Sequence, residues 1–130
     1  MILLPILIGT IIFDILFYCS DSLLKYKEPF SSNISTFSSI SIGFLSMSFS
    51  VMFSYAEKKS FKDWKASGHF NTWIALYIFA FISNILTLTS SFIILPYPQF
   101  IDASIGLLSV SILSSILVFL PIFCSVQRLK

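Results

Sequence analysis

An acidic side chain within an apolar stretch is the first candidate for chemistry in this chain. Asp14 is the only charged residue between Ile2 and Tyr18. A carboxylate within a membrane span is costly, usually faces other protein, and often marks a proton or ion pathway. Two interpretations stay open: Asp14 hydrogen-bonds polar residues such as Asn84 and Thr87, or helix one is shifted so that Asp14 reaches the membrane interface.

Small and polar residues recur at helical spacing in the later apolar stretches. In the second stretch they are spaced four, three, four and four residues apart, so they share one helix face: Ser39, Gly43, Ser46, Ser50 and Ser54. The third stretch repeats the pattern with Ala80, Asn84, Thr87 and Ser91, and the fourth with Ser104, Ser111 and Ser115. We expect these stripes to form the seams between helices, because small residues allow close backbone approach. A polar path for ions or water is the alternative.

Catalytic and metal-binding patterns are absent from the sequence. It contains no HExxH, no nucleophile elbow and no glycine-rich phosphate loop. His69 is the single histidine, and one histidine without further ligands does not make a zinc site. The net charge of +2 is too small to indicate nucleic-acid binding. We therefore expect a protein that is not an enzyme, without a cofactor or direct nucleic-acid contact.

The composition predicts the solvent that surrounds the protein. Of the 130 residues, 56% are hydrophobic and only 11% are charged, whereas a soluble domain is about 25% charged. Small soluble domains bury only about 60–70% of their surface, so water does not suit this chain. The sequence predicts an all-α membrane protein with one domain, residues 1–130, in contact with membrane lipid.

Four apolar stretches are long enough, or nearly so, to cross a hydrocarbon core about 30 Å thick, which takes about 20 helical residues. We predict four transmembrane helices in an up-down bundle, at about 2–19, 34–56, 71–95 and 103–126. Helices are preferred to strands because these runs exceed the roughly 10 alternating residues of a barrel strand.

The distribution of basic residues predicts the orientation. The loop between helices two and three and the C-terminal tail lie on one side and hold six basic residues: Lys58, Lys59, Lys62, Lys65, Arg128 and Lys130. The opposite side holds two, Lys25 and Lys27. The positive-inside rule then places both termini of this multi-pass protein in the cytoplasm.

The basic loop at 57–70 also contains two aromatic residues three positions apart, Phe61 and Trp64. Lysines surround them at positions 58, 59, 62 and 65. One interpretation is an interfacial turn held by anionic lipid. The other is a docking surface for a cytoplasmic protein partner, and both uses involve the same six residues.

The layout resembles a family of small bacterial membrane proteins. A short first helix is followed by a Ser-Ser entry into helix two at Thr36–Leu45, a basic loop, the segment Ser67–Phe70, and a basic tail at Gln127–Lys130. In hydropathy, loop charge and size this is similar to the four-helix membrane components of phage-defence systems, of the RexB phage-exclusion type and the KwaA type of the Kiwa system. The resemblance implies a homo-oligomer that senses or perturbs the inner membrane and acts with a cytoplasmic partner.

Two other classes of protein share this size and topology. Four-helix immunity proteins bind the helices of pore-forming bacteriocins within the inner membrane, and they too need no catalytic residues. Accessory subunits of large membrane complexes are the third class. The identity of the neighbouring genes separates the three.

Overall fold

The computed structural model describes residues 3–17, 25 and 27–127, and within these ranges it contains helices and turns but no strand. The helices are α1 (Leu3–Phe17), α3 (Lys27–Ser54), α4 (Lys59–Ala66), α5 (His69–Ile94) and α6 (Ile101–Gln127), with the short 3-10 helix η2 (Pro98–Phe100) before α6. The prediction of an all-α protein is confirmed for this part of the chain.

Three of the helices have the length of a membrane crossing. α3, α5 and α6 contain 28, 26 and 27 residues, which corresponds to about 39–42 Å at ~1.5 Å per residue. Each contains a long window of apolar residues, so the chain has the features of a multi-pass membrane protein. α1 is apolar but has only 15 residues, or about 22 Å, which is less than the roughly 30 Å of a hydrocarbon core. The expectation of a fourth full-length span is therefore not met by the described part of α1.

The start of one helix and the structure of the predicted basic loop differ from the prediction. α3 begins at Lys27 rather than near residue 34, and Glu28 and Pro29 occupy its first turn, where an acidic residue and a proline are both favourable. The predicted basic loop contains a helix of its own, α4. Gly68, with a φ of 78°, separates α4 from α5 in a left-handed conformation that favours glycine.

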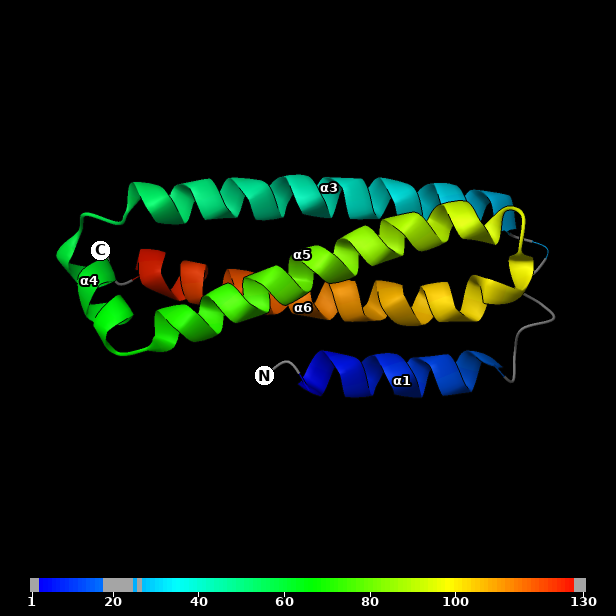
Figure 1. Ribbon diagram of the computed structural model, residues 1–130, viewed down its shortest axis with the longest axis horizontal. Coiled ribbons are helices and arrows are strands. Elements are labelled where there is room, and N and C mark those ends of the chain that lie inside the picture. Colours follow the sequence, from blue (N-terminus) through cyan, green and yellow to red (C-terminus); the bar gives the residue numbers. More distant parts are fainter. Residues whose placement is uncertain (1–2, 18–24, 26, 128–130) are drawn as a thin grey trace.

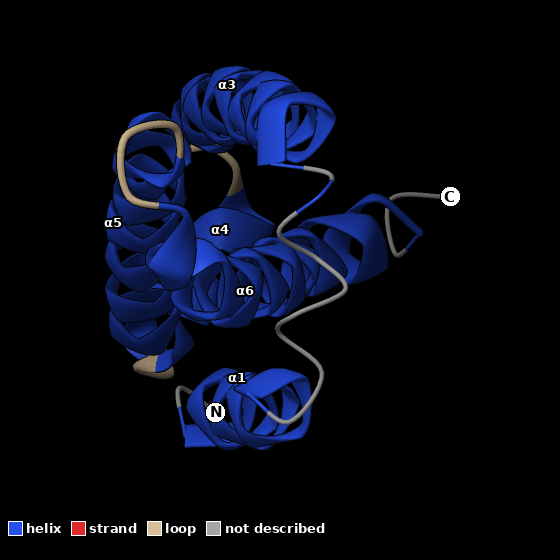
Figure 2. Ribbon diagram, turned by 90° about the vertical axis from the view of Figure 1, so that its right-hand side faces the viewer, coloured by secondary structure: helices blue, strands red, loops and turns tan. Residues whose placement is uncertain are grey.

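The helices alternate in direction, as an up-down fold requires, but they form an open row. α5 packs between α3 and α6, and α6 packs between α5 and α1. Figure 1 shows α4 and the end of α6 at one end of the molecule, and η2 at the other. Viewed along the helices, α1 and α3 lie on opposite sides of the α5–α6 pair (Figure 2). We call the two ends of the molecule the α4 end and the η2 end.

Two glycines allow α1 to approach α6 closely. A Cβ atom placed on Gly9 would collide with Cγ2 of Val110 and lie 3.2 Å from the carbonyl oxygen of Gly106. A Cβ on Gly106 would lie 3.4 Å from the Gly9 carbonyl oxygen and from Cβ of Phe13. Small residues at a helix crossing are the usual means of association in lipid. α1 lies along the half of α6 nearest the η2 end (Figure 1).

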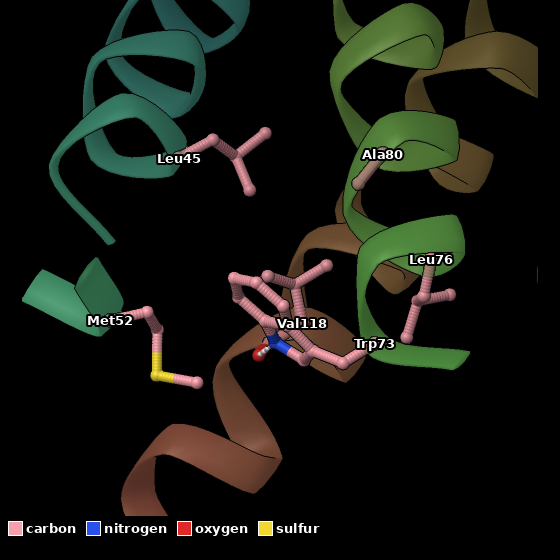
Figure 3. Close-up of a cluster of buried hydrophobic side chains, with 6 residues drawn as sticks. All are labelled: Leu45, Met52, Trp73, Leu76, Ala80 and Val118. Carbon is pink, nitrogen blue, oxygen red and sulfur yellow. Dashed lines mark hydrogen bonds between the residues drawn. The ribbon is translucent and has the colours of Figure 1, made fainter. Parts of the chain in front are cut away.

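The main apolar cluster lies toward the α4 end. Figure 3 shows its six buried side chains, which come from three helices: Leu45, Met52, Trp73, Leu76, Ala80 and Val118. The indole Nε1 of Trp73 donates a hydrogen bond of 3.1 Å to the carbonyl oxygen of Val118. Pro121, which lacks a backbone N–H, interrupts the hydrogen bonding of α6 three residues later. Trp73 thus joins α5 to α6 three residues before this proline.

The glycine crossing generates a test with an internal control. We predict that Gly9→Leu destabilises the protein by on the order of 1–3 kcal/mol, because the added side chain has no space against α6. Gly43→Leu places the same side chain on α3, where a Cβ meets nothing within 4 Å, and it is expected to be neutral or stabilising because leucine favours helix over glycine. Unfolding in a mixed-detergent titration measures both. Equal stability of the two variants would contradict the close α1–α6 contact.

Candidate functional site

Buried polar side chains gather in one half of the molecule. They occupy the first part of α3, the second part of α5 and the first two-thirds of α6, which adjoin the η2 end: Ser31, Ser38, Ser83, Asn84, Thr87, Ser91, Asp102, Ser104, Ser111, Ser114 and Ser115. We call this set the polar half-core. Among the described side chains toward the α4 end, the buried ones are apolar apart from Ser48, and we call the six-residue cluster of Figure 3 the apolar plug.

Hydroxyl and amide hydrogen bonds join α5 to α6 in the middle of the half-core. The Nδ2 of Asn84 donates to Oγ of Ser115 at 3.1 Å and to the carbonyl oxygen of Ala80 at 2.8 Å. The hydroxyls of Ser83 and Ser114 lie 3.2 Å apart. Ser115 in turn donates to the carbonyl oxygen of Ser111. Asn84 is near the middle of α5, so this junction lies close to the midplane of the span.

One hydrogen bond between α3 and α5 fixes how α3 is aligned along α5. The hydroxyl of Ser31 donates to the carbonyl oxygen of Ser91 at 2.6 Å. Ser38 is seven residues after Ser31, and Asn84 is seven residues before Ser91. Because the helices are antiparallel and seven residues make two turns, Ser38 lies at the level of Asn84. All three long helices therefore contribute a buried polar group to this level.

Three buried polar atoms in the half-core lack a hydrogen-bond partner: Oγ of Ser38, Oδ1 of Asn84 and Oδ1 of Asp102. The exposed fractions of the three side chains are 0%, 0% and 5%. Ser38 differs from neighbouring serines such as Ser39 and Ser48, whose hydroxyls donate to carbonyl oxygens one turn back at 2.8 Å. Unpaired buried polar atoms are rare in native proteins and usually mark an ordered water or a functional group.

The predicted intramembrane candidates divide into two sets. Asn84 and Thr87 are buried, and Thr87 donates to the carbonyl oxygen of Ser83 at 2.7 Å. Asp14 is exposed in the last turn of α1, a helix that packs on α6. The predicted hydrogen bond from Asp14 to Asn84 or Thr87 is wrong, because α1 lies outside the seam in which those two residues are enclosed. The alternative, that Asp14 reaches the interface, stays a prediction.

The stripe predicted to pack α3 into the bundle faces outward. Ser39, Gly43, Ser46, Ser50 and Ser54 are all exposed, so the expectation of a seam within this chain is wrong for α3. Its buried face is offset from the stripe and includes Ser31, Ile34, Ser38, Leu45, Ser48 and Met52. Serines and large apolar side chains occur on both faces of α3, since Leu45 and Met52 are buried whereas Phe44 and Met47 are exposed. In α5 and α6, by contrast, the small residues named from the sequence are buried.

The six residues predicted to contact a partner or lipid also divide. Phe61 and Trp64 are half-buried and turn inward, with ring centroids 5.2 and 5.5 Å from that of Phe70. Trp64 also contacts the ring of Trp73 at 6.1 Å. These two rings therefore attach α4 to α5, and contact of their remaining exposed surface with a partner or lipid stays a prediction. The other four are exposed: Lys58, Lys59, Lys62 and Lys65. Lys58 lies over the ring of Tyr55 and Lys65 over that of Phe70.

Asp102 and Ser38 were not among the candidates chosen from sequence. The sequence signal for Asp102 was present, because it is the only charged residue in the first three turns of a highly apolar helix. Its burial depends on α6 beginning at Ile101, beside η2. Ser38 has no distinguishing sequence signal, since its role follows only from the register that Ser31 and Ser91 set.

Comparison with protein-family models, with curated proteins and with solved structures finds no match to this chain. Within the described residues, no group of three His, Cys, Asp or Glu side chains could hold a metal ion. The functional argument therefore depends on the polar half-core, the apolar plug and α4.

The Asn84–Ser115 bond generates a quantitative prediction. A double-mutant cycle of Asn84→Ala and Ser115→Ala is expected to yield a coupling free energy of about 0.6 kcal/mol, the typical value for hydrogen bonds between membrane helices. The same cycle with Ser39→Ala in place of Ser115→Ala is expected to yield none, because Ser39 is exposed and bonds its own helix. Unfolding free energies in detergent measure both cycles. Equal coupling in both would contradict the assignment of Asn84 as a link between α5 and α6.

Proposed function

We propose that the protein is a non-enzymatic component of the bacterial cytoplasmic membrane that senses or perturbs this membrane and acts with a cytoplasmic partner in phage defence. The observation that carries the proposal is α4, a short helix whose aromatic face is attached to the bundle and whose lysines are all exposed, although Lys65 lies over the Phe70 ring at 6.0 Å. The proposed orientation puts α4 on the cytoplasmic side.

The attachment of α4 makes its basic surface a preformed one. Contacts between Phe61, Trp64 and Phe70, with centroid separations of 5.2–5.9 Å, enclose the aromatic face. Each such contact contributes about 0.5–1.5 kcal/mol beyond area burial. A basic surface on an anchored helix loses little conformational entropy when it binds, which favours an acidic protein surface as its partner.

Removal of the positive charges from the α4 surface is expected to weaken partner binding. Replacing Lys58, Lys59, Lys62 and Lys65 with Gln is expected to weaken binding of the cytoplasmic protein encoded by the adjacent gene by at least about tenfold, because complementary charge speeds association. Copurification in mild detergent measures binding, and plating efficiency of phage on cells with both genes measures protection. Both are expected to fall together.

Two controls keep this test specific. A reporter fused after Lys130 establishes that the variant keeps its orientation, since basic loops also orient membrane proteins. Asp63→Asn changes an exposed acidic residue of the same helix, and it is expected to leave partner binding unchanged or strengthen it. Full binding by the correctly oriented fourfold variant would overturn the proposal.

A groove beside α1 supports a second candidate, an immunity protein against a pore-forming bacteriocin. The groove has a volume of about 390 Å³ and lies between α1, α5 and α6, with Phe13, Phe79, Leu86 and Val110 in its walls. Its almost entirely apolar lining suits an apolar helix of a toxin. Protection of sensitive cells from a coencoded pore-forming toxin, abolished by Leu86→Trp within the groove, would favour this function over phage defence.

A further inference from the structure

We infer that the polar half-core takes up water from the η2 end and forms a polar pathway that reaches the midplane and stops at the apolar plug. The inference concerns the interior of the three long helices and does not depend on a partner at α4. The proposed function and this inference can therefore fail separately.

Polar groups continue through successive levels of the half-core. Asp102 and Ser104 lie in the first turns of α6, beside η2. The Ser31–Ser91 bond lies deeper, and two turns further in the three helices contribute Ser38, Asn84 and Ser115 to one level. Most of these hydroxyls donate to their own helices, and serine alone is weak evidence for a pathway. The unpartnered atoms are the stronger evidence.

The unpartnered atoms lie at the two ends of this series. Oδ1 of Asp102 is at the η2 end, and Oγ of Ser38 and Oδ1 of Asn84 are at the deepest level. Ser38 offers a donor and Asn84 an acceptor across the α3–α5 seam, and a water molecule satisfies both. α3 and α6 share little contact along the half-core, although Ile34 of α3 and Ile101 of α6 belong to one buried apolar cluster with Ile94 near the η2 end.

The apolar plug ends the series before it reaches the α4 end. Ala80 and Val118, both with an exposed fraction of 0%, follow directly after Asn84 and Ser115 in the direction of the α4 end. Leu76, Trp73 and Met52 continue the apolar packing. Among the described residues of this half only Ser48 is a buried polar one, and its hydroxyl bonds the carbonyl oxygen of Phe44. Among the described residues, the buried polar groups other than Ser48 therefore lie on one side of the midplane, beside the smaller apolar cluster of Ile34, Ile94 and Ile101.

Cysteine accessibility tests this inference. In a chain with Cys19→Ser and Cys124→Ser, single cysteines are treated with membrane-impermeant methanethiosulfonate reagents on either side of sealed vesicles. Tyr97→Cys, exposed near η2, and Lys59→Cys, exposed at α4, identify the two sides. Ser38→Cys is expected to react only from the Tyr97 side. Its rate is expected to be at least about tenfold above that of a cysteine in apolar surroundings, because only the thiolate reacts.

Two matched variants decide what the reactivity means. Ser39→Cys lies at the same depth but is exposed on the outer face of α3, and Ser48→Cys is buried in the apolar half. Both are expected to be unreactive in the membrane. All three variants, Ser38→Cys included, are expected to react fully after denaturation in SDS. If Ser38→Cys matches these two in the membrane, or reacts from the Lys59 side, the inference is wrong.

Asp102 provides a second, independent readout. At Ser104→Cys, two residues from Asp102, a cationic reagent is expected to react at least about fivefold faster than an anionic one, the factor for unit charges about 4 Å apart in water. Asp102→Asn is expected to abolish the preference and leave the reactivity of Ser38→Cys with an uncharged reagent unchanged. A preference that survives this substitution would remove Asp102 from the pathway.

Discussion

Hydrocarbon contains no water to accept or donate hydrogen bonds, so every polar group of a spanning helix needs a partner within the protein. This chain contains many serines and threonines, and most of those described meet the requirement locally. Ser46 donates to the carbonyl oxygen of Ile42 at 2.9 Å, and Thr89 donates to that of Ile85 at 2.9 Å. A hydroxyl that is satisfied on its own helix can face either lipid or protein at little cost. The larger side chains then decide how the helices pack.

The same constraint explains how much the sequence could predict. Three long helices and their alternating direction follow from the apolar runs and short loops. The buried face of α3 does not, because Ser38 and Ser39 are chemically equal and both faces carry large apolar residues, such as Leu45 on the buried face and Phe44 on the exposed one. Of the candidate site, Asn84 and Thr87 were predictable as polar residues within a span. α4 was not predictable as a packed helix, since Phe61 and Trp64 need Phe70 and Trp73 to pack against.

The buried polar contacts lie in one half of the interior, which also contains a small apolar cluster of Ile34, Ile94 and Ile101, and the larger apolar cluster lies in the other half. Near the midplane, hydrogen bonds such as Asn84–Ser115 join α5 to α6, and each contributes modestly in a membrane. Toward the α4 end the helices are held by close-packed side chains and by the Trp73–Val118 bond. The two outer helices, α1 and α4, each pack against a different half. α1 crosses α6 at Gly9 and Gly106 beside the polar half-core, and α4 packs against the rings that adjoin the apolar plug.

α5 is the element that runs through both halves. Aromatic contacts run from Trp64 on α4 to Phe70, Trp73, Tyr77 and Phe81 along α5, and Asn84 follows three residues later. A ligand that binds α4 affects the half-core only if α4 can occupy two positions and the ligand binds one of them more tightly than the other. Because α4 is attached to α5 by ring contacts that include Trp73, a change in its position alters the packing of Trp73 in the plug. Contiguity of contacts alone does not establish coupling, but it identifies Trp73 as the residue where movement of α4 would first reach the boundary between apolar and polar interior.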